Sequence, residues 1–172
     1  MKAILIRHGK TKGNAEQRYI GTTDECLTNE GIEEIKKISY PRADIVITSP
    51  MVRCIQTAEI IYGKYDDIFV GLRECNFGAF ENKNYMELKD DVFYQKWLES
   101  GGKLPFPMGE NKDDFSKRCL ESFKDAVNKY KSSETVAFVV HGGTIMSIAQ
   151  YYIGGEFYDY HLKNGEYMII SL

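Results

Sequence analysis

The chain is short of long hydrophobic runs, and this excludes several classes of protein. No apolar run in its 172 residues approaches the roughly 20 that a membrane-spanning helix requires. The apolar stretch near its start is too short for a signal peptide, so we expect a cytoplasmic protein. Glycine and proline are present in ordinary numbers and aromatic residues make up 13%, which excludes a fibrous or disordered chain.

Paired cysteines and an excess of positive charge are also missing. Cys26, Cys54, Cys75 and Cys119 lie far apart without a Cys-x-x-Cys pair, so we expect buried or partly buried reduced thiols rather than a zinc site or disulfide framework. The 22 Lys and Arg residues against 25 Asp and Glu give a net charge of −3. Nucleic acids and anionic membranes are therefore not expected partners. Any bound anion must be held by a local cluster of cations.

Strand and helix patterns alternate along the sequence. Short runs rich in Ile and Val at 3–6, 44–48 and 135–140 predict buried strands of a parallel sheet. Thr28, Ser49 and Asn111 each precede a stretch with helical spacing of apolar residues, where they can cap a helix. We therefore predict an α/β fold, a three-layer α/β/α arrangement with a mostly parallel mixed central sheet, formed by one domain over residues 1–172.

The last part of the sequence is typical of a β-hairpin. Two apolar stretches, 158–162 and 167–172, flank the segment Lys163-Asn164-Gly165-Glu166. Asn-Gly favours a tight turn between antiparallel strands, so a terminal hairpin is predicted.

Residues suited to chemistry follow the predicted strands. Arg7 and His8 follow the first, Arg53 the second and His141 the third, and Glu74 comes after a further apolar stretch. The carboxyl ends of parallel strands share one edge of a sheet, so these side chains should gather there. Each of the two histidines precedes a glycine, which lets backbone and ligand approach closely.

Three kinds of site could use this set. A phosphate-binding P-loop is excluded, because GxxxxGK[ST] needs a glycine where Ile4 stands inside a strand. A metal site of His8, His141 and Glu74 is opposed by the two arginines, whose charges would repel a cation. The remaining interpretation is an anion pocket, in which the arginines bind phosphoryl oxygens.

Ordered motifs over nearly the whole chain resemble the histidine phosphatase superfamily, in its phosphoglycerate mutase-like branch. The matching stretches are LIRHGKTKGN at 5–14, RYIG at 18–21, LTNEG at 27–31, SPMVRCIQTA at 49–58, LRE at 72–74 with FG at 77–78, GE at 109–110 and VHGG at 140–143. Phe80 and Asn82 depart from the family pattern, which has Trp and Gly there. They are expected to border the substrate cleft and so to affect the choice of substrate.

The resemblance implies a role for each matching residue. His8 is the expected nucleophile, attacking phosphorus through one ring nitrogen while a backbone carbonyl holds the other N–H. Arg7, Arg53 and, when protonated, His141 would surround the phosphoryl group, and Glu74 would act as general acid, with Glu81 and Glu110 as alternatives. The expected substrate-binding residues are Asn14, Arg18, Ile20, Gly21 and Gly142. Neither a metal nor another cofactor is expected.

Substrate choice is expected to depend on residues 76–111, the predicted substrate-cap segment, which is rich in aromatic residues. We predict a metal-independent phosphomonoesterase that hydrolyses a small-molecule phosphate ester through a phosphohistidine. Short members of the family include alpha-ribazole phosphatases, which makes alpha-ribazole 5'-phosphate a candidate substrate. The alternatives are a cofactor-dependent phosphoglycerate mutase and a non-catalytic module that binds a phosphate ligand.

Overall fold

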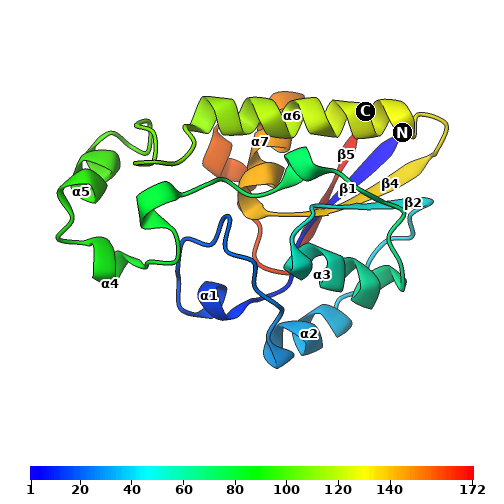
Figure 1. Cartoon of the computed structure of the whole chain (residues 1–172). Coiled ribbons are helices and arrows are strands. Elements are labelled where there is room, and N and C mark those ends of the chain that lie inside the picture. Colours follow the sequence, from blue (N-terminus) through cyan, green and yellow to red (C-terminus); the bar gives the residue numbers. More distant parts are fainter.

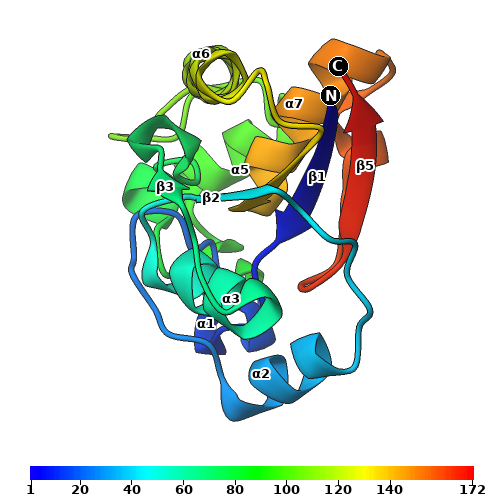
Figure 2. The ribbon, with the colours of Figure 1, turned by 90° about the vertical axis from the view of Figure 1, so that its right-hand side faces the viewer.

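The computed structural model describes residues 1–172 and contains a five-stranded sheet in the order β3-β2-β4-β1-β5 (Figures 1 and 2). The first four strands in this order run parallel, and β5 pairs antiparallel with β1 at the edge. The sheet is therefore mixed and mostly parallel, as predicted. The strands are β1 (Lys2–Arg7), β2 (Ile45–Thr48), β3 (Asp67–Ile68), β4 (Thr135–Val140) and β5 (Tyr167–Ser171).

Helices cover both faces of the sheet and complete the three predicted layers. In Figure 2, α6 and α7 lie on one side of the strands, and α2 and α3 lie on the other. None of the helices has the length and apolar composition needed to span a membrane. The α-helices are α1 (Lys12–Ala15), α2 (Asn29–Lys36), α3 (Val52–Tyr62), α4 (Tyr85–Leu88), α5 (Val92–Glu99), α6 (Lys112–Lys129) and α7 (Gly142–Ile153), and the 3₁₀ turns are η1 (Val70–Leu72), η2 (Gly78–Phe80) and η3 (Phe157–Tyr160).

The strands bury both of their faces, which explains their continuous apolar sequences. Successive side chains of a strand point to opposite faces. Leu5 of β1 therefore packs in the same cluster as Phe123 of α6, while Ile4 and Ile6 pack with Ala58 of α3. The central strands are thus packed between two hydrophobic clusters, which fix the positions of the residues at their carboxyl ends.

Two of the three predicted helix caps are present. The Thr28 side chain accepts a hydrogen bond from the Gly31 backbone, and Asn111 accepts one from Asp114. The prediction for Ser49 is wrong, because α3 begins only at Val52. The carboxylate of Asp24 accepts from the Val52 backbone N–H at 2.9 Å, and so satisfies this helix end from a distant loop.

The predicted terminal hairpin is also wrong. Residues 157–160 form the 3₁₀ turn η3, and β5 pairs with β1 instead of with the segment before it. The side-chain amide of Asn164 instead donates hydrogen bonds to the carbonyl of His8 at 3.1 Å and to the side chain of Asn14 at 3.0 Å. The turn at Asn164-Gly165 does form, but the segments on its two sides do not pair with each other as strands.

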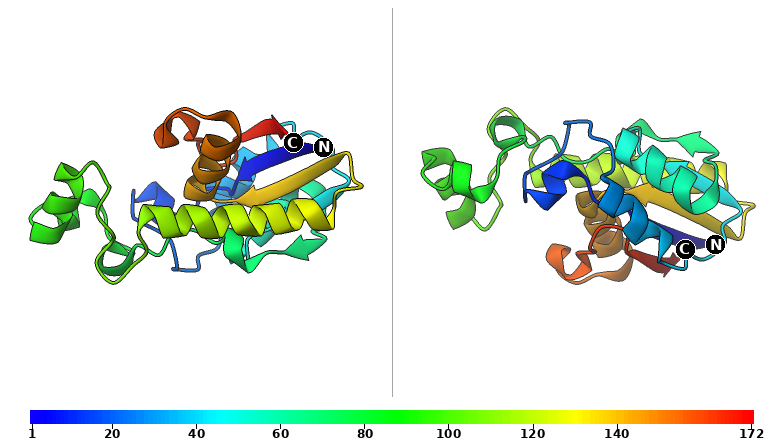
Figure 3. Two further views of the ribbon diagram at one scale, coloured as in Figure 1. Left: turned by 90° about the horizontal axis from the view of Figure 1, so that it is seen from above. Right: turned by 90° about the horizontal axis from the view of Figure 1, so that it is seen from below.

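The segment 76–111 carries α4 and α5, which project away from the sheet (Figure 3). It has a small core of its own, in which Phe80, Leu88 and Tyr94 are buried. Phe80 packs inside this core, and neither it nor Asn82 lines the cavity described below, so their expected position at the cleft border is wrong. Asn82 has a φ of 55°, a left-handed conformation that Asn tolerates better than most residues other than Gly.

Candidate active site

His8 stands directly after β1 and is 4% exposed. Its Nδ1 lies 2.8 Å from the carbonyl oxygen of Gly9, and a carbonyl can only accept, so Nδ1 carries the proton of the neutral ring. Nε2 therefore keeps a free lone pair. Burial, and then the charge of Arg53, hold the pKa of His8 well below its usual range, which keeps the ring neutral.

Arg53 is fully buried in the first turn of α3, and every nitrogen of its guanidinium is bonded to protein. Nη1 donates to the carbonyl of Thr23 at 2.8 Å and Nη2 to that of Gly21 at 2.9 Å. Nε lies 3.3 Å from Nδ1 of His141. The residues 21–23 therefore fix the plane of this cation.

His141 directly follows β4. The centre of its ring lies 5.1 Å from the centre of the His8 ring. Arginine only donates, so Nδ1 of His141 accepts from Arg53, and Nε2–H points to the hydroxyl of Ser49 at 2.7 Å. Burial and the charge of Arg53 hold the pKa of His141 well below its usual range. His141 is thus neutral here, and could carry the expected positive charge only if a bound anion raised its pKa.

Arg7 offers a hydrogen-bond donor that the protein does not use. Its Nη1 donates to the Leu162 carbonyl and lies 3.3 Å from Nε2 of His161, but its buried Nε has no partner. Burial lowers the pKa of Arg7, while Glu74 and Glu166 oppose this effect. An unpaired buried N–H is unfavourable, so this edge of Arg7 is suited to an anion.

Glu74 lies beside the N-terminus of α7. Its carboxylate accepts from the backbone N–H groups of Cys75 at 2.9 Å and Gly143 at 3.2 Å. Burial nevertheless raises the pKa of Glu74 above its ordinary value, as a proton donor requires. A Cβ at position 143 would lie 2.4 Å from Oε1 of Glu74, so a side chain there would displace this carboxylate.

Glu81 supports the arginine rather than the reacting group. One oxygen of its carboxylate accepts from the backbone N–H groups of Gly21 at 2.8 Å and Thr23 at 2.9 Å. The carbonyls of the same two residues hold Arg53. Glu81 therefore fixes the loop that orients the buried cation.

Glu110 forms a two-pronged ion pair with Arg118, at 2.8 Å to Nε and 2.7 Å to Nη2. Arg118 also donates to the backbone carbonyls of Arg73 and Glu74, at 3.0 and 3.3 Å. These contacts hold the loop that carries Glu74. Of the three candidate carboxylates, only Glu74 lines the cavity described next.

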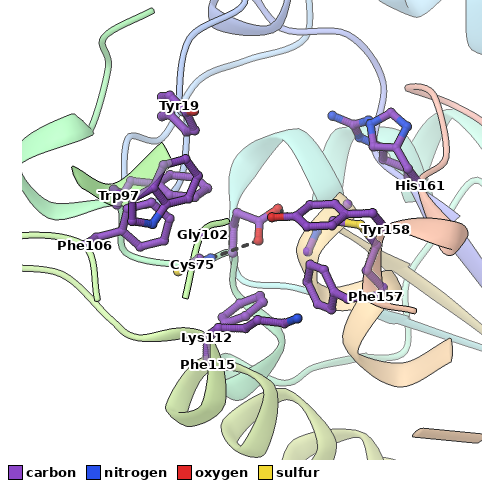
Figure 4. Close-up of a pocket in the computed structure, with 16 residues that line it drawn as sticks. Tyr19, Cys75, Trp97, Gly102, Phe106, Lys112, Phe115, Phe157, Tyr158 and His161 are labelled. Carbon is purple, nitrogen blue, oxygen red and sulfur yellow. Dashed lines mark hydrogen bonds between the residues drawn. The ribbon is translucent and has the colours of Figure 1, made fainter. Parts of the chain in front are cut away.

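A cavity of about 310 Å³ adjoins Glu74 and has largely aromatic walls (Figure 4). Tyr19, Trp97 and Phe106 line one side, and Phe157 and Tyr158 face them across it. Of the predicted site residues, Arg7, Glu74 and Gly142 line this cavity. Its other lining residues are Cys75, Phe77, Gly102, Lys112, Phe115, Gly143, Met146 and His161.

The other predicted substrate-binding residues lie outside this cavity. Arg18 pairs with Glu16 at 2.6 Å and with Glu87 at 2.7 Å, and so joins the loop after α1 to α4. Asn14 accepts from Asn164, and Ile20 is buried. Gly21 acts through its backbone: it holds Arg53, and a Cβ there would lie 1.8 Å from the Cys75 carbonyl.

Sequence reasoning missed Ser49, Lys112, Tyr158 and His161 as parts of the site. The sequence predicts that Ser49 caps a helix, and it predicts that Tyr158 and His161 lie in a strand of the terminal hairpin. Lys112 lies one residue beyond the predicted substrate-cap segment. The site also holds no group of three His, Cys, Asp or Glu side chains arranged for a metal ion, and all four cysteines are unpaired, with Cys26 exposed and the other three buried.

Comparison with known proteins places this geometry in a family. The chain is 30% identical over 157 residues to a Hydrogenobacter thermophilus protein provisionally named phosphoserine phosphatase 2, covering 86% of this chain and 76% of that protein. It is 27% identical over 189 residues to the 2,3-bisphosphoglycerate-dependent phosphoglycerate mutase of Corynebacterium diphtheriae, covering 87% and 76%.

The same fold occurs in the alpha-ribazole phosphatase of Shigella flexneri, with a TM-score of 0.88, 24% identity, and coverage of 100% of this chain and 91% of that one. The family model of the histidine phosphatase superfamily (branch 1) matches residues 3–172 of this chain. The chain therefore belongs to the histidine phosphatase superfamily.

Proposed function

We propose that the protein is a phosphomonoesterase that hydrolyses a small-molecule phosphate ester through a phosphohistidine on His8. Membership of the superfamily supports an enzyme with phosphatase or mutase activity. The observation that carries the proposal is the arrangement around His8: a neutral ring with a free Nε2 lies near two arginines, and a carboxyl group with a raised pKa lies at the edge of a cavity.

The reaction would take place in two displacements. Nε2 of His8 forms a bond to phosphorus while the ester P–O bond breaks, and Glu74 gives its proton to the leaving oxygen. Glu74, now a carboxylate, then takes a proton from water as the water oxygen attacks phosphorus and the P–N bond breaks. Arg7 and Arg53 stabilise the phosphoryl oxygens in both steps, because both stay cationic. Arg7 offers its unpaired Nε–H, and Arg53 offers the second N–H of Nη1 and of Nη2.

The cavity supports hydrolysis of an ester with an apolar, ring-containing alcohol. Phosphoglycerate is small and highly charged, whereas nine of the sixteen residues around this cavity are hydrophobic. Alpha-ribazole 5'-phosphate, whose phosphatase shares this fold, is one candidate substrate. The segment 76–111, which we propose as the substrate cap, has only two short helices, and its buried residues pack among themselves, leaving little to exclude water from a phosphoenzyme. We place the enzyme in the cytoplasm, acting on a small molecule without a metal or other cofactor.

Incubation with 3-phosphoglycerate and a trace of 2,3-bisphosphoglycerate separates hydrolysis from transfer. We expect 4-nitrophenyl phosphate to release phosphate while 3-phosphoglycerate is isomerised at least about 100-fold more slowly, since water reaches the phosphohistidine. Phosphate release and 2-phosphoglycerate formation would be followed together. Fast isomerisation with negligible phosphate release would establish a mutase, and binding of phosphate esters without any turnover would establish a binding module.

The rate should be greatest on the acidic side of neutral pH. His8 must be neutral to attack, so kcat/KM falls as the pH drops through its pKa, which lies well below 6.5. Glu74 must be protonated, so kcat/KM falls as the pH rises through its pKa, which lies above 4.5. Rate profiles from pH 4 to 9 would check this. A maximum above about pH 8 would contradict these two roles.

A further inference from the structure

Lys112 is a cation at the aromatic cavity that has no anionic partner. It is the first residue of α6, and its Nζ lies 4.3 Å from the centre of the Phe157 ring and 6.0 Å from that of Tyr158. It makes no ion pair and no hydrogen bond through its side chain, unlike Lys10, which pairs with two glutamates. Its charge is therefore directed to the aromatic edge of the cavity (Figure 4).

The position of Lys112 is unfavourable for the helix that it begins. The N-terminus of a helix carries a partial positive charge and stabilises anions, as Asp113 and Asp114 in the same turn illustrate. Both of these aspartates are exposed, and Asp114 is bonded to Asn111, at 2.6 Å from its amide. A lysine here stabilises neither the helix terminus nor a neighbouring carboxylate. Its contact with the protein is the face of the Phe157 ring, which leaves the N–H donors of the ammonium unused and available to a ligand.

Cations lie at two separated edges of the cavity. Arg7 contacts His161, and Figure 4 shows His161 and Lys112 apart, with Tyr158 between them. The surface between these edges is aromatic. Such an arrangement matches a ligand that has an anionic group at each end and an apolar ring in the middle. A volume of about 310 Å³ is at the lower end of the range for small-molecule sites, and so suits one ring system.

We propose that Lys112 binds a second anionic group on the substrate, and that the substrate class is phosphate monoesters whose alcohol carries both a flat ring and an acidic substituent. This inference rests on the proposed function, because it takes the phosphoryl group to lie at Arg7 and Glu74. The Lys112 ammonium would form a charge-assisted contact with a carboxylate or a second phosphoryl group. The aromatic walls would hold the ring through its faces and edges.

A pair of isosteric phosphonates tests the proposal without turnover. In 4-carboxybenzylphosphonate and 4-nitrobenzylphosphonate a CH₂ replaces the ester oxygen, and the two differ by one negative charge at nearly constant shape. Calorimetry would give the dissociation constant of each for the wild type, for Lys112→Met and for Lys117→Met. Lys117 is an exposed lysine of the same helix that does not line the cavity, so it controls for the loss of one charge.

We expect the wild type to bind the carboxylate about tenfold more tightly than the nitro compound, as one charge-assisted contact allows. Lys112→Met should remove this preference, whereas Lys117→Met and Lys112→Arg should keep it. The 3-carboxy isomer and 4-phosphonomethylbenzylphosphonate would then show which anionic group, and at which ring position, Lys112 prefers.

If the wild type binds neither the 4-carboxy nor the 3-carboxy compound more tightly than the nitro compound, the proposal is overturned. An equal loss for both compounds in Lys112→Met would do the same, since it would make Lys112 a wall of the cavity only. Turnover of 4-nitrophenyl phosphate reports separately on the proposed function. If turnover is absent while the preference for the carboxylate depends on Lys112, the binding site stands and the hydrolytic function falls.

Discussion

His8→Ala is expected to lower kcat for 4-nitrophenyl phosphate by about 10⁴-fold or more, because no other side chain of the site can replace the nucleophile. The variant should also form no covalent phosphoenzyme. His141 cannot substitute for it, since its Nδ1 accepts from Arg53 and its Nε2 faces Ser49. The measurement is rapid quenching of enzyme with labelled substrate, with a test for a phosphoryl group that is labile in acid and stable in base.

His141→Ala is the matched comparison for this experiment. The variant removes a buried histidine from the same site, so a general loss of packing would affect both proteins. We expect it to slow the reaction while some phosphoryl group still accumulates on His8. Phosphohistidine in His8→Ala would show that the nucleophile is another residue.

Glu74→Gln is expected to lower kcat by about 10²- to 10⁴-fold for alkyl phosphates, whose alkoxide leaves only when protonated. The loss should be much smaller for 4-nitrophenyl phosphate, because nitrophenolate is a good leaving group without a proton. Because glutamine does not lose a proton at any accessible pH, the fall of kcat/KM at high pH should be absent in Glu74→Gln. Steady-state rates on an alkyl and a nitrophenyl ester would give the ratio.

That ratio separates acid catalysis from damage to the fold. In Glu74→Gln the new side-chain amide would face the backbone N–H of Cys75 or Gly143, and any local distortion should slow both esters alike. Glu121→Gln, an exposed carboxylate on α6, controls for the loss of one negative charge. An equal loss on both esters in Glu74→Gln would refute its role as general acid.

Strands and the strand-end residues could be predicted from the sequence because their signals are local. The run Thr135–Val140 matches β4 residue for residue, since a strand buried on both faces must be apolar throughout. The topology rule for parallel sheets then brings His8 and His141 to one edge, and their rings lie 5.1 Å apart. The tautomer of His8 also follows the prediction that a carbonyl holds its N–H.

The errors concern residues whose partners are distant in the chain. Ser49 has the composition of a helix cap, but its hydroxyl lies 2.7 Å from His141, 92 residues away. Asn164-Gly165 has the composition of a hairpin turn, but it binds the loop after β1. Lys112 and His161 were missed for the same reason, because only the folded chain brings them to the cavity. Local patterns predict local hydrogen bonds, whereas the contacts that place these residues at the site come from distant parts of the chain.

The two departures from the family pattern have local physical explanations. Phe80, in place of the usual Trp, is 1% exposed in the small core of 76–111, where an aromatic ring of either kind can be buried. Asn82, in place of the usual Gly, keeps a positive φ, and its carbonyl accepts from Arg18. Neither residue lines the cavity.

The pairing of β1 has a consequence for how the enzyme is made. This strand ends directly before His8, the proposed nucleophile, and its two neighbours are β4 and β5, which follow it by about 130 residues or more. During synthesis on the ribosome, β1 is made well before β4 and β5 and cannot join the sheet until both have followed it. Such a high contact order is associated with slow folding, and it leaves an apolar segment exposed to the nascent-chain chaperones in the meantime. The proposed phosphoryl chemistry should therefore begin only after β4 and β5 have paired with β1.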